Sequence, residues 1–151
     1  MKRRLKFLRL KNRNNYNMSR KSIPEKMFQQ DAFSQWMGME VTASKEGFSV
    51  VELTVRKEMT NGFKIAHGGI AYSLADSALA FASNSMGSKA VSIETNISHI
   101  KPVNTGDRLV ATAELKEKSK RLARFDVEVR CKNERVALFH GTVFITEKKW
   151  E

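Results

Sequence analysis

The sequence predicts a single α+β domain in which a curved antiparallel sheet wraps one long apolar helix. Three observations lead to this class. Small and apolar residues recur at helical spacing over residues 68–84, apolar and polar residues alternate through most of the chain after them, and two strand-like runs come before them. A length of 151 residues suits one hydrophobic core better than two.

The first expected element is an amphipathic helix between Pro24 and Gly38. Proline favours the first turn of a helix, and glycine commonly ends one. Apolar side chains repeat between them at roughly helical spacing, so this helix should pack on the domain. These side chains are Met27, Phe28, Phe33 and Trp36.

The sheet is predicted from two groups of strands on either side of the long helix. The runs MEVTASKEG and FSVVELTVRKEM should form a hairpin that turns near residues 45–47. The helix at 68–84 carries small residues on most of its sides, which lets a sheet approach it closely. Four strands should follow as an antiparallel meander, because the turns at 104–107, 117–121 and 132–135 are short.

The net charge of +11 is concentrated at the N-terminus. Residues 1–21 hold nine of the 27 basic residues and none of the 16 acidic ones, so the remainder is nearly neutral. We therefore predict a basic, disordered leader at 1–21, the folded domain at 22–147 and a tail at 148–151. A leader that binds nucleic acid or an anionic membrane, an organellar transit peptide and a natural start at Met18 stay open, although a nucleic-acid partner is disfavoured.

Several classes of function are disfavoured by what the sequence lacks. Cys131 is the only cysteine, so no internal disulfide can form and a reducing, cytoplasmic location is expected. No run of about 18 apolar residues exists that could cross a membrane. P-loop, H-E-x-x-H and G-x-S-x-G patterns are missing. His67, His99 and His140 lack metal-ligand spacing, so we expect neither a metal nor a cofactor.

Asp76 is an unusual residue for the middle of an apolar helix. No basic residue stands three or four positions from it, so it has no local ion pair. One interpretation is that Asp76 caps a second helical piece that begins at Ser77. The other is that a carboxylate in apolar surroundings has a raised pKa and serves as a base or nucleophile.

The start of the same helix carries a second candidate group. His67, Gly68 and Gly69 offer backbone N–H groups at the positive end of the helix dipole, where an oxyanion could be stabilised. They could equally be a flexible loop with a capping histidine. His67 and Asp76 should lie about 13 Å apart on opposite faces of the helix. If both serve one reaction, two subunits must share the site, which predicts a two-fold dimer.

Six sequence features together carry a family resemblance. They are Asn61, HGG at 67–69, LAD at 74–76, ALAFASNS at 78–85, NISHIKPVNTGDRLVATAEL at 96–115 and VALFHGTV at 136–143. In these features the chain resembles the hotdog-fold thioesterases of the phenylacetic-acid-degradation (PaaI) type. The resemblance implies a hotdog fold, homodimers that often pair into tetramers, and hydrolysis of acyl-CoA thioesters without a metal.

The resemblance also implies roles for particular residues. Asp76 matches the carboxylate that attacks the thioester or activates water, and the Gly68 N–H matches the group that polarises the carbonyl. His67 matches the histidine beside that oxyanion site, and Asn61 matches the asparagine that positions water or substrate. Further candidates for substrate contact are Gly69, Ser92, Tyr72, Phe81 and Met86, and candidates for binding the CoA phosphates are Lys101, Lys118, Lys120 and Arg121.

Two other functions stay open at this level. Hotdog domains also serve as non-catalytic acyl-CoA sensors or regulators. A hotdog enoyl-CoA hydratase also uses an Asp and His pair, but it needs both residues close together in one chain. The acyl group cannot be identified from the sequence; we expect a medium-chain or aromatic one.

Overall fold

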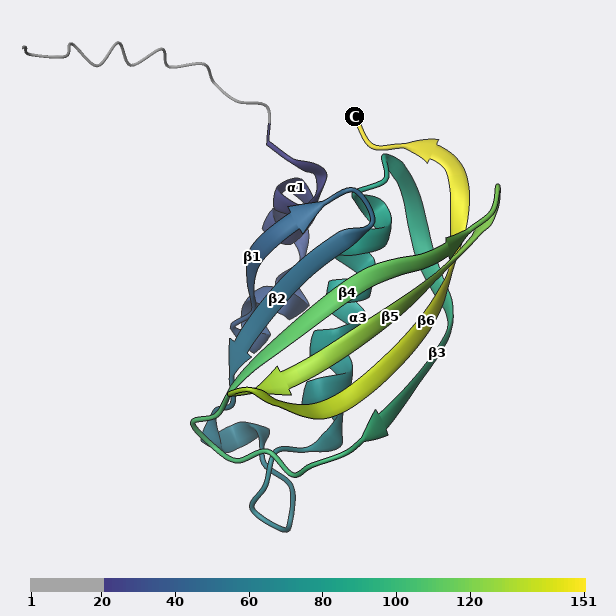
Figure 1. Cartoon of the computed structure of the whole chain (residues 1–151). Coiled ribbons are helices and arrows are strands. Elements are labelled where there is room, and N and C mark those ends of the chain that lie inside the picture. Colours follow the sequence, from purple (N-terminus) through teal and green to yellow (C-terminus); the bar gives the residue numbers. More distant parts are fainter. Residues whose placement is uncertain (1–20) are drawn as a thin grey trace, which may run out of the picture.

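The computed structural model describes residues 21–151, so nearly all of the predicted leader lies outside the described residues. Within them, six antiparallel strands form one curved sheet that wraps a long helix (Figure 1). The α+β class predicted from the periodicity is confirmed.

Two short helices stand where the sequence predicts one: α1 (Ile23–Gln30) and α2 (Ala32–Met37). Asp31 separates them, and its carboxylate accepts a hydrogen bond from the Ser34 N–H at 2.9 Å, which caps α2. Because this break changes which side chains of the second piece face inward, Phe33 and Trp36 are 50% and 68% exposed. The prediction that these two aromatic rings pack on the domain is therefore wrong for the single chain.

The strands agree with the predicted periods, but one pairing differs. They are β1 (Glu40–Lys45), β2 (Phe48–Thr54), β3 (Ser88–His99), β4 (Arg108–Lys118), β5 (Leu122–Cys131) and β6 (Glu134–Lys149), in the sheet order β1-β2-β4-β5-β6-β3. The β1–β2 hairpin forms as predicted. The four-stranded meander is wrong, because β3 pairs with β6 and not with β4. Alternation of apolar and polar residues identifies a strand but not the strand it pairs with. Here residues 100–107 connect β3, at one edge of the sheet, to β4 near its middle.

The long helix α3 (Gly68–Asn84) has the predicted bounds. It is continuous, so Asp76 does not cap a second helix, and that interpretation is excluded. Leu74, Ala78 and Ala82 are completely buried under the sheet. The contact is so close that a Cβ added at Gly141 of β6 would lie 2.5 Å from a methyl carbon of Leu79.

The first two residues of the predicted tail at 148–151 belong to the sheet, since β6 runs to Lys149. Trp150 is fixed by two hydrogen bonds. Its indole N–H donates to Asn84 Oδ1 at 2.8 Å, and its backbone N–H donates to the Gly87 carbonyl at 3.1 Å.

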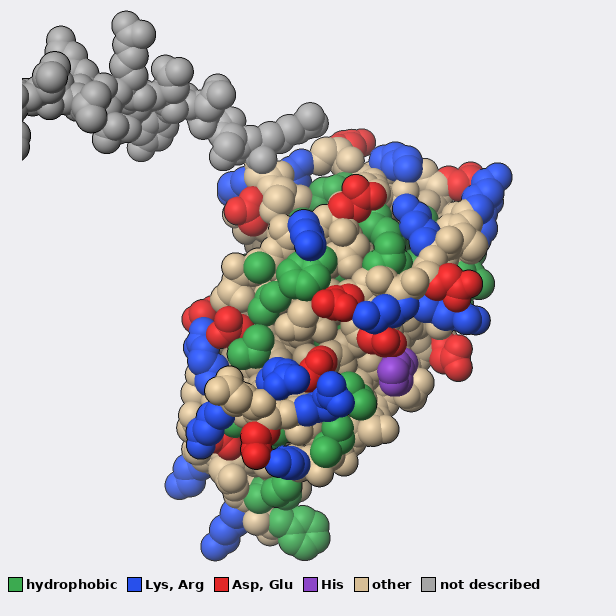
Figure 2. Space-filling model, viewed as in Figure 1, with side chains coloured by type: hydrophobic (Ala, Val, Ile, Leu, Met, Phe, Trp, Pro, Cys, Tyr) green, Lys and Arg blue, Asp and Glu red, His purple; other side chains and the backbone are tan. Residues whose placement is uncertain are grey.

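Basic and acidic side chains are interspersed with apolar and uncharged ones over the outer face of the sheet (Figure 2). Arg108, for example, binds Glu52 at 2.6 Å and Glu40 at 3.0 Å. Exposed pairs of this kind stabilise a fold by about 1 kcal/mol or less each. Exposed apolar side chains also lie on the edge strand β3, where Val91 and Ile93 are 57% and 59% exposed.

Candidate active site

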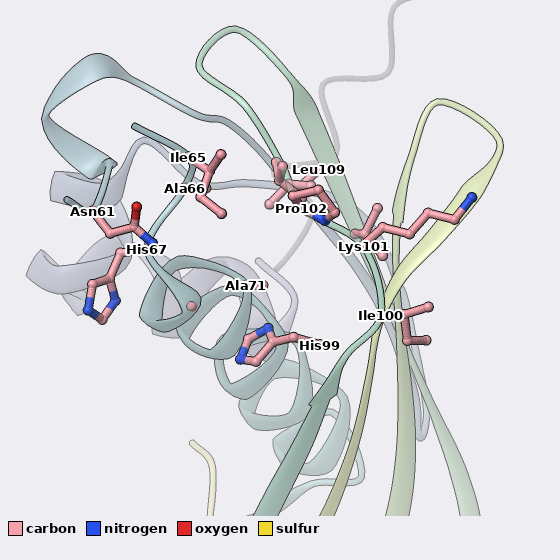
Figure 3. Close-up of a pocket in the computed structure, with 13 residues that line it drawn as sticks. Asn61, Ile65, Ala66, His67, Ala71, His99, Ile100, Lys101, Pro102 and Leu109 are labelled. Atoms are coloured by element: carbon pink, nitrogen blue, oxygen red, sulfur yellow. The ribbon is translucent and has the colours of Figure 1, made fainter. Parts of the chain in front are cut away.

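The N-terminal end of α3 opens into a pocket of about 330 Å³ (Figure 3). Three of the four predicted catalytic residues, Asn61, His67 and Gly68, line it. His99, at the end of β3, lines it as well. The structure thus brings together residues from a loop, a helix start and a strand end.

Backbone hydrogen bonds hold the loop that precedes α3. The Ala66 N–H donates to the Val103 carbonyl at 2.7 Å, and the His67 N–H donates to the Met59 carbonyl at 2.8 Å. These bonds fix the point at which the chain enters the helix, so the first helical N–H groups have a defined direction.

Asn61 stabilises the same loop with one end of its side chain. Its Oδ1 accepts a hydrogen bond from the Phe63 N–H at 2.9 Å. Its Nδ2 makes no hydrogen bond to any of residues 21–151 and remains able to donate into the pocket.

The two glycine amides at the helix start differ in what they can offer a ligand. The Gly69 N–H already donates to His67 Nδ1 at 2.9 Å. The Gly68 N–H is the first of the helix and has no hydrogen-bond partner in the described part of the chain. It also lies at the positive end of the helix dipole. Gly68 is therefore the better placed of the two to bind a developing oxyanion, and His67 holds the helix start.

His99 lines this pocket, although its sequence position suggested only a candidate metal ligand. A Cβ at Gly68 would lie 3.0 Å from His99 Nε2, so the imidazole packs directly on the glycine. No spacing rule relates residues 68 and 99, because the contact depends on where β3 runs beside the start of α3. A weaker signal was the position of His99 at the end of the NISH run.

Asp76 lies in a different pocket, which has a volume of about 410 Å³. This pocket is bounded by α1, α3, β3, β6 and the Trp150 that follows β6, and Ser92 of β3 lines it as well. Burial raises the pKa of Asp76, and no partner among residues 21–151 opposes the shift. The two pockets share no lining residue, so a single chain separates Asp76 from the Gly68 N–H.

Tyr72 and Phe81, which were predicted to contact the substrate, instead pack against other side chains within the single chain. Tyr72 shares a hydrogen bond with Thr95 through their hydroxyl groups and lies edge-on to Phe139. Phe81 is 1% exposed and packs beside Phe28. Neither Tyr72 nor Phe81 lines either pocket. Gly69 borders a separate hollow next to Trp36, and Met86 packs against the core. Lys101, one of the candidate cations for the CoA phosphates, borders the pocket at the helix start and forms an ion pair with Glu134 at 3.0 Å.

Metal and thiol chemistry have no arranged site in residues 21–151. No three His, Cys, Asp or Glu side chains there are grouped to hold a metal ion. His140 lies on the outer face of the sheet, where its Nδ1 is 2.7 Å from Asp126 Oδ1. Cys131 is buried, and burial raises the pKa of its thiol. None of the helices in the described range has the length and apolarity needed to span a bilayer.

A family profile and a curated relative decide the family. The profile described as the thioesterase superfamily matches residues 63–138, about half of the chain. The acyl-coenzyme A thioesterase PaaI of Escherichia coli is 39% identical over 116 residues, which cover 76% of this chain and 83% of PaaI. The chain belongs to the thioesterase superfamily.

Solved structures of thioesterase-superfamily proteins agree with this assignment. E. coli PaaI matches with a TM-score of 0.81 and 36% identity, over 83% of this chain and 91% of PaaI. A mutant of PaaI from Thermus thermophilus matches with a TM-score of 0.74 and 39% identity, over 76% of this chain and 98% of that one. A hypothetical thioesterase from Streptococcus pneumoniae, solved with coenzyme A, matches with a TM-score of 0.77 and 25% identity, over 83% of this chain and 98% of that one. The hotdog fold and the resemblance to PaaI are confirmed.

Proposed function

We propose that this member of the thioesterase superfamily hydrolyses acyl-CoA thioesters to the free acid and CoA, at sites shared between two subunits. One observation carries the proposal. The pocket at the start of α3 contains donors and imidazoles but no carboxylate, and the pocket around Asp76 contains a carboxylate but no histidine. Each pocket has the groups that the other needs for hydrolysis of a thioester.

The chemistry follows from placing these two half-sites against each other. The thioester oxygen accepts a hydrogen bond from the Gly68 N–H, which stabilises the negative charge that develops there. Asp76 of the other subunit, in its ionised form, takes a proton from water while the water oxygen bonds to the carbonyl carbon. The carbon–sulfur bond then breaks, and the CoA thiolate leaves and is protonated. Direct attack by the carboxylate, followed by hydrolysis of the anhydride, uses the same arrangement.

Strand β3 supports a homodimer as the assembly that joins the half-sites. As an edge strand, β3 has one side of its backbone free to pair with another strand among the described elements. Its side chains Val91 and Ile93 are exposed and apolar. Pairing of two β3 strands about a two-fold axis would extend the sheet and cover both side chains. A tetramer made of two such dimers, and a cytoplasmic location, are further parts of this proposal.

A complementation experiment tests whether the site is shared. We would co-express Asp76→Asn subunits with Gly68→Val subunits, which damage different halves of the site. Random pairing of two inactive subunits should restore about a quarter of the wild-type kcat, because half of the dimers would contain one intact site. Each variant purified alone should show almost no CoA release. If the mixture is as inactive as the single variants while native mass spectrometry shows mixed dimers, the shared site is wrong.

The activity itself is tested with purified wild-type protein and a panel of aliphatic, phenylacetyl and hydroxybenzoyl CoA esters. Release of free CoA thiol supports the thioesterase. An enoyl-CoA ester is added to the panel, and loss of its enoyl absorbance without free thiol would point to a hydratase. Tight binding without either change would point to a sensor. The apolar lining and the volume of the Asp76 pocket favour a medium-chain or aromatic acyl group.

A further inference from the structure

The pocket around Asp76 extends along one stripe of α3. Asp76, Ala80, Ser83 and Asn84 all line it, and their spacing of three and four residues places them on the same side of the helix. Eight residues separate Asp76 from Asn84, which corresponds to about 12 Å along the helix axis. The pocket therefore has the carboxylate near one end and Asn84 near the other.

Trp150 stands at the Asn84 end and is held there rigidly. Its indole N–H donates to Asn84 Oδ1 at 2.8 Å, and the ammonium group of Lys89 lies 5.1 Å from the centre of its ring. Asn84 is itself buried and fixed, because its side-chain amide exchanges two hydrogen bonds of 3.0 Å with the backbone of Ala90. The tryptophan ring is thus attached to a part of the core that cannot easily move.

The rest of the lining is mostly apolar. The side chains that surround the space between Asp76 and Trp150 include Met27, Leu79, Ala90, Val91 and Val143. Lys89 is the one cation among the described lining residues, and its position over the Trp150 ring places it at the far end from Asp76. A lining of this kind suits a hydrocarbon group better than the charged nucleotide end of CoA.

We propose that Trp150 is the end wall of the acyl pocket and limits the length of the acyl group that this enzyme accepts. The proposal rests on the thioesterase function proposed above. An acyl group whose carbonyl carbon lies at Asp76 would extend along α3 until it meets the indole ring. Met27 of α1 also lines this pocket, although it lies far from Trp150 in the sequence. The neighbouring Lys26 contacts the Glu151 carbonyl, and this contact joins α1 to the segment that carries Trp150.

The test is a chain-length profile of kcat/KM for saturated acyl-CoA esters, measured for wild type and Trp150→Ala. Removal of the indole should raise kcat/KM for esters longer than the wild-type optimum by about tenfold or more, the usual scale for added apolar contact in a pocket. Esters shorter than the optimum should change by less than about threefold, since the Asp76 end is untouched. An unchanged profile in a folded Trp150→Ala protein would overturn the proposal.

Two further variants keep the test decisive. Phe144→Ala is the matched control: Phe144 lies on β6 beneath Arg121, much as Trp150 lies beneath Lys89, but it does not line the pocket. Its profile should match that of wild type, and an equal shift in both alanine variants would count against a specific wall. Trp150→Leu covers the case in which the alanine variant does not fold, and it should shift the profile toward longer esters by a smaller amount.

A binding measurement separates failure of this inference from failure of the proposed function. In a Trp36→Phe, Asp76→Asn background Trp150 is the only tryptophan, and turnover is suppressed. Its fluorescence should change with a medium-chain acyl-CoA and stay constant with CoA alone. If wild type releases no CoA from any ester, the thioesterase proposal fails, and this signal still reports contact between the acyl chain and Trp150. If wild type is active but the signal and the profile do not respond, only the end-wall proposal fails.

Discussion

The two pockets along α3 differ in the kind of residue that builds them. The pocket at the helix start is lined by two histidines, Asn61 and several apolar side chains, and its distinctive group is the N–H of Gly68, which has no hydrogen-bond partner among residues 21–151. The pocket at the middle of the helix is formed by apolar side chains around a single carboxylate, Asp76, whose pKa burial raises. The first presents a backbone donor at the positive end of the helix dipole, and the second holds a carboxylate in apolar surroundings. The comparison indicates that a helix can contribute to two reactions at once if a second subunit completes each site.

The largest expected effect comes from removing the carboxylate. Asp76→Asn should lower kcat by about 10²-fold or more, because the reaction loses its base or nucleophile while the side chain keeps its size. Free CoA release on the best ester is the measurement. Ser92→Ala is a comparison within the same pocket and should have a much smaller effect. Near-normal turnover by Asp76→Asn would contradict the role assigned to this pocket.

A smaller effect is expected at the start of the helix. Gly68→Ala introduces a Cβ that would lie 3.0 Å from His99 Nε2, so the imidazole or the helix start must move. We expect kcat to fall by about tenfold, since displacement of an oxyanion donor by a fraction of an ångström weakens it without removing it. Gly62→Ala is the matched control in the preceding loop, because nothing lies within 4 Å of its added Cβ. Equal activity of the two variants would show that the contact with His99 is unimportant.

The pH dependence of activity should show the environment of Asp76. Because burial raises its pKa, the ionised form that acts as base or nucleophile appears only above the ordinary range for aspartate. The kcat/KM of wild type should therefore rise with pH through this raised pKa. A fall at acid pH centred on the pKa of a free aspartate would show that the pocket does not desolvate this group in solution.

The folding stability should depend on pH through the same carboxylate, but it should fall with rising pH where the activity rises. A pKa that is higher in the folded than in the unfolded chain means that the folded state binds the proton more tightly, so stability decreases as pH rises through the raised pKa. Asp76→Asn removes this dependence. Its melting temperature at pH 7 should equal or exceed that of wild type, and the difference should shrink toward pH 3. A variant that is less stable at pH 7 would indicate a favourable interaction of the carboxylate.

Much of the fold and of the candidate site was predictable because it depends on local patterns. The bounds of α3 followed from small apolar residues at helical spacing, and the strands followed from alternation. The separation of His67 from Asp76 followed from helix geometry alone. The break at Asp31 was missed because the apolar spacing runs across it, whereas the capping bond to Ser34 that creates it becomes visible only in the structure.

The sequence by itself determined that one apolar helix carries a donor at its start and a carboxylate at its middle. Only the tertiary structure decided what surrounds each group. His99 reaches Gly68 and Trp150 reaches the Asp76 pocket because β3 pairs with β6 at the edge of the sheet. Contacts of this kind depend on which strands pair and in what register, and alternation along a single strand holds no information about either.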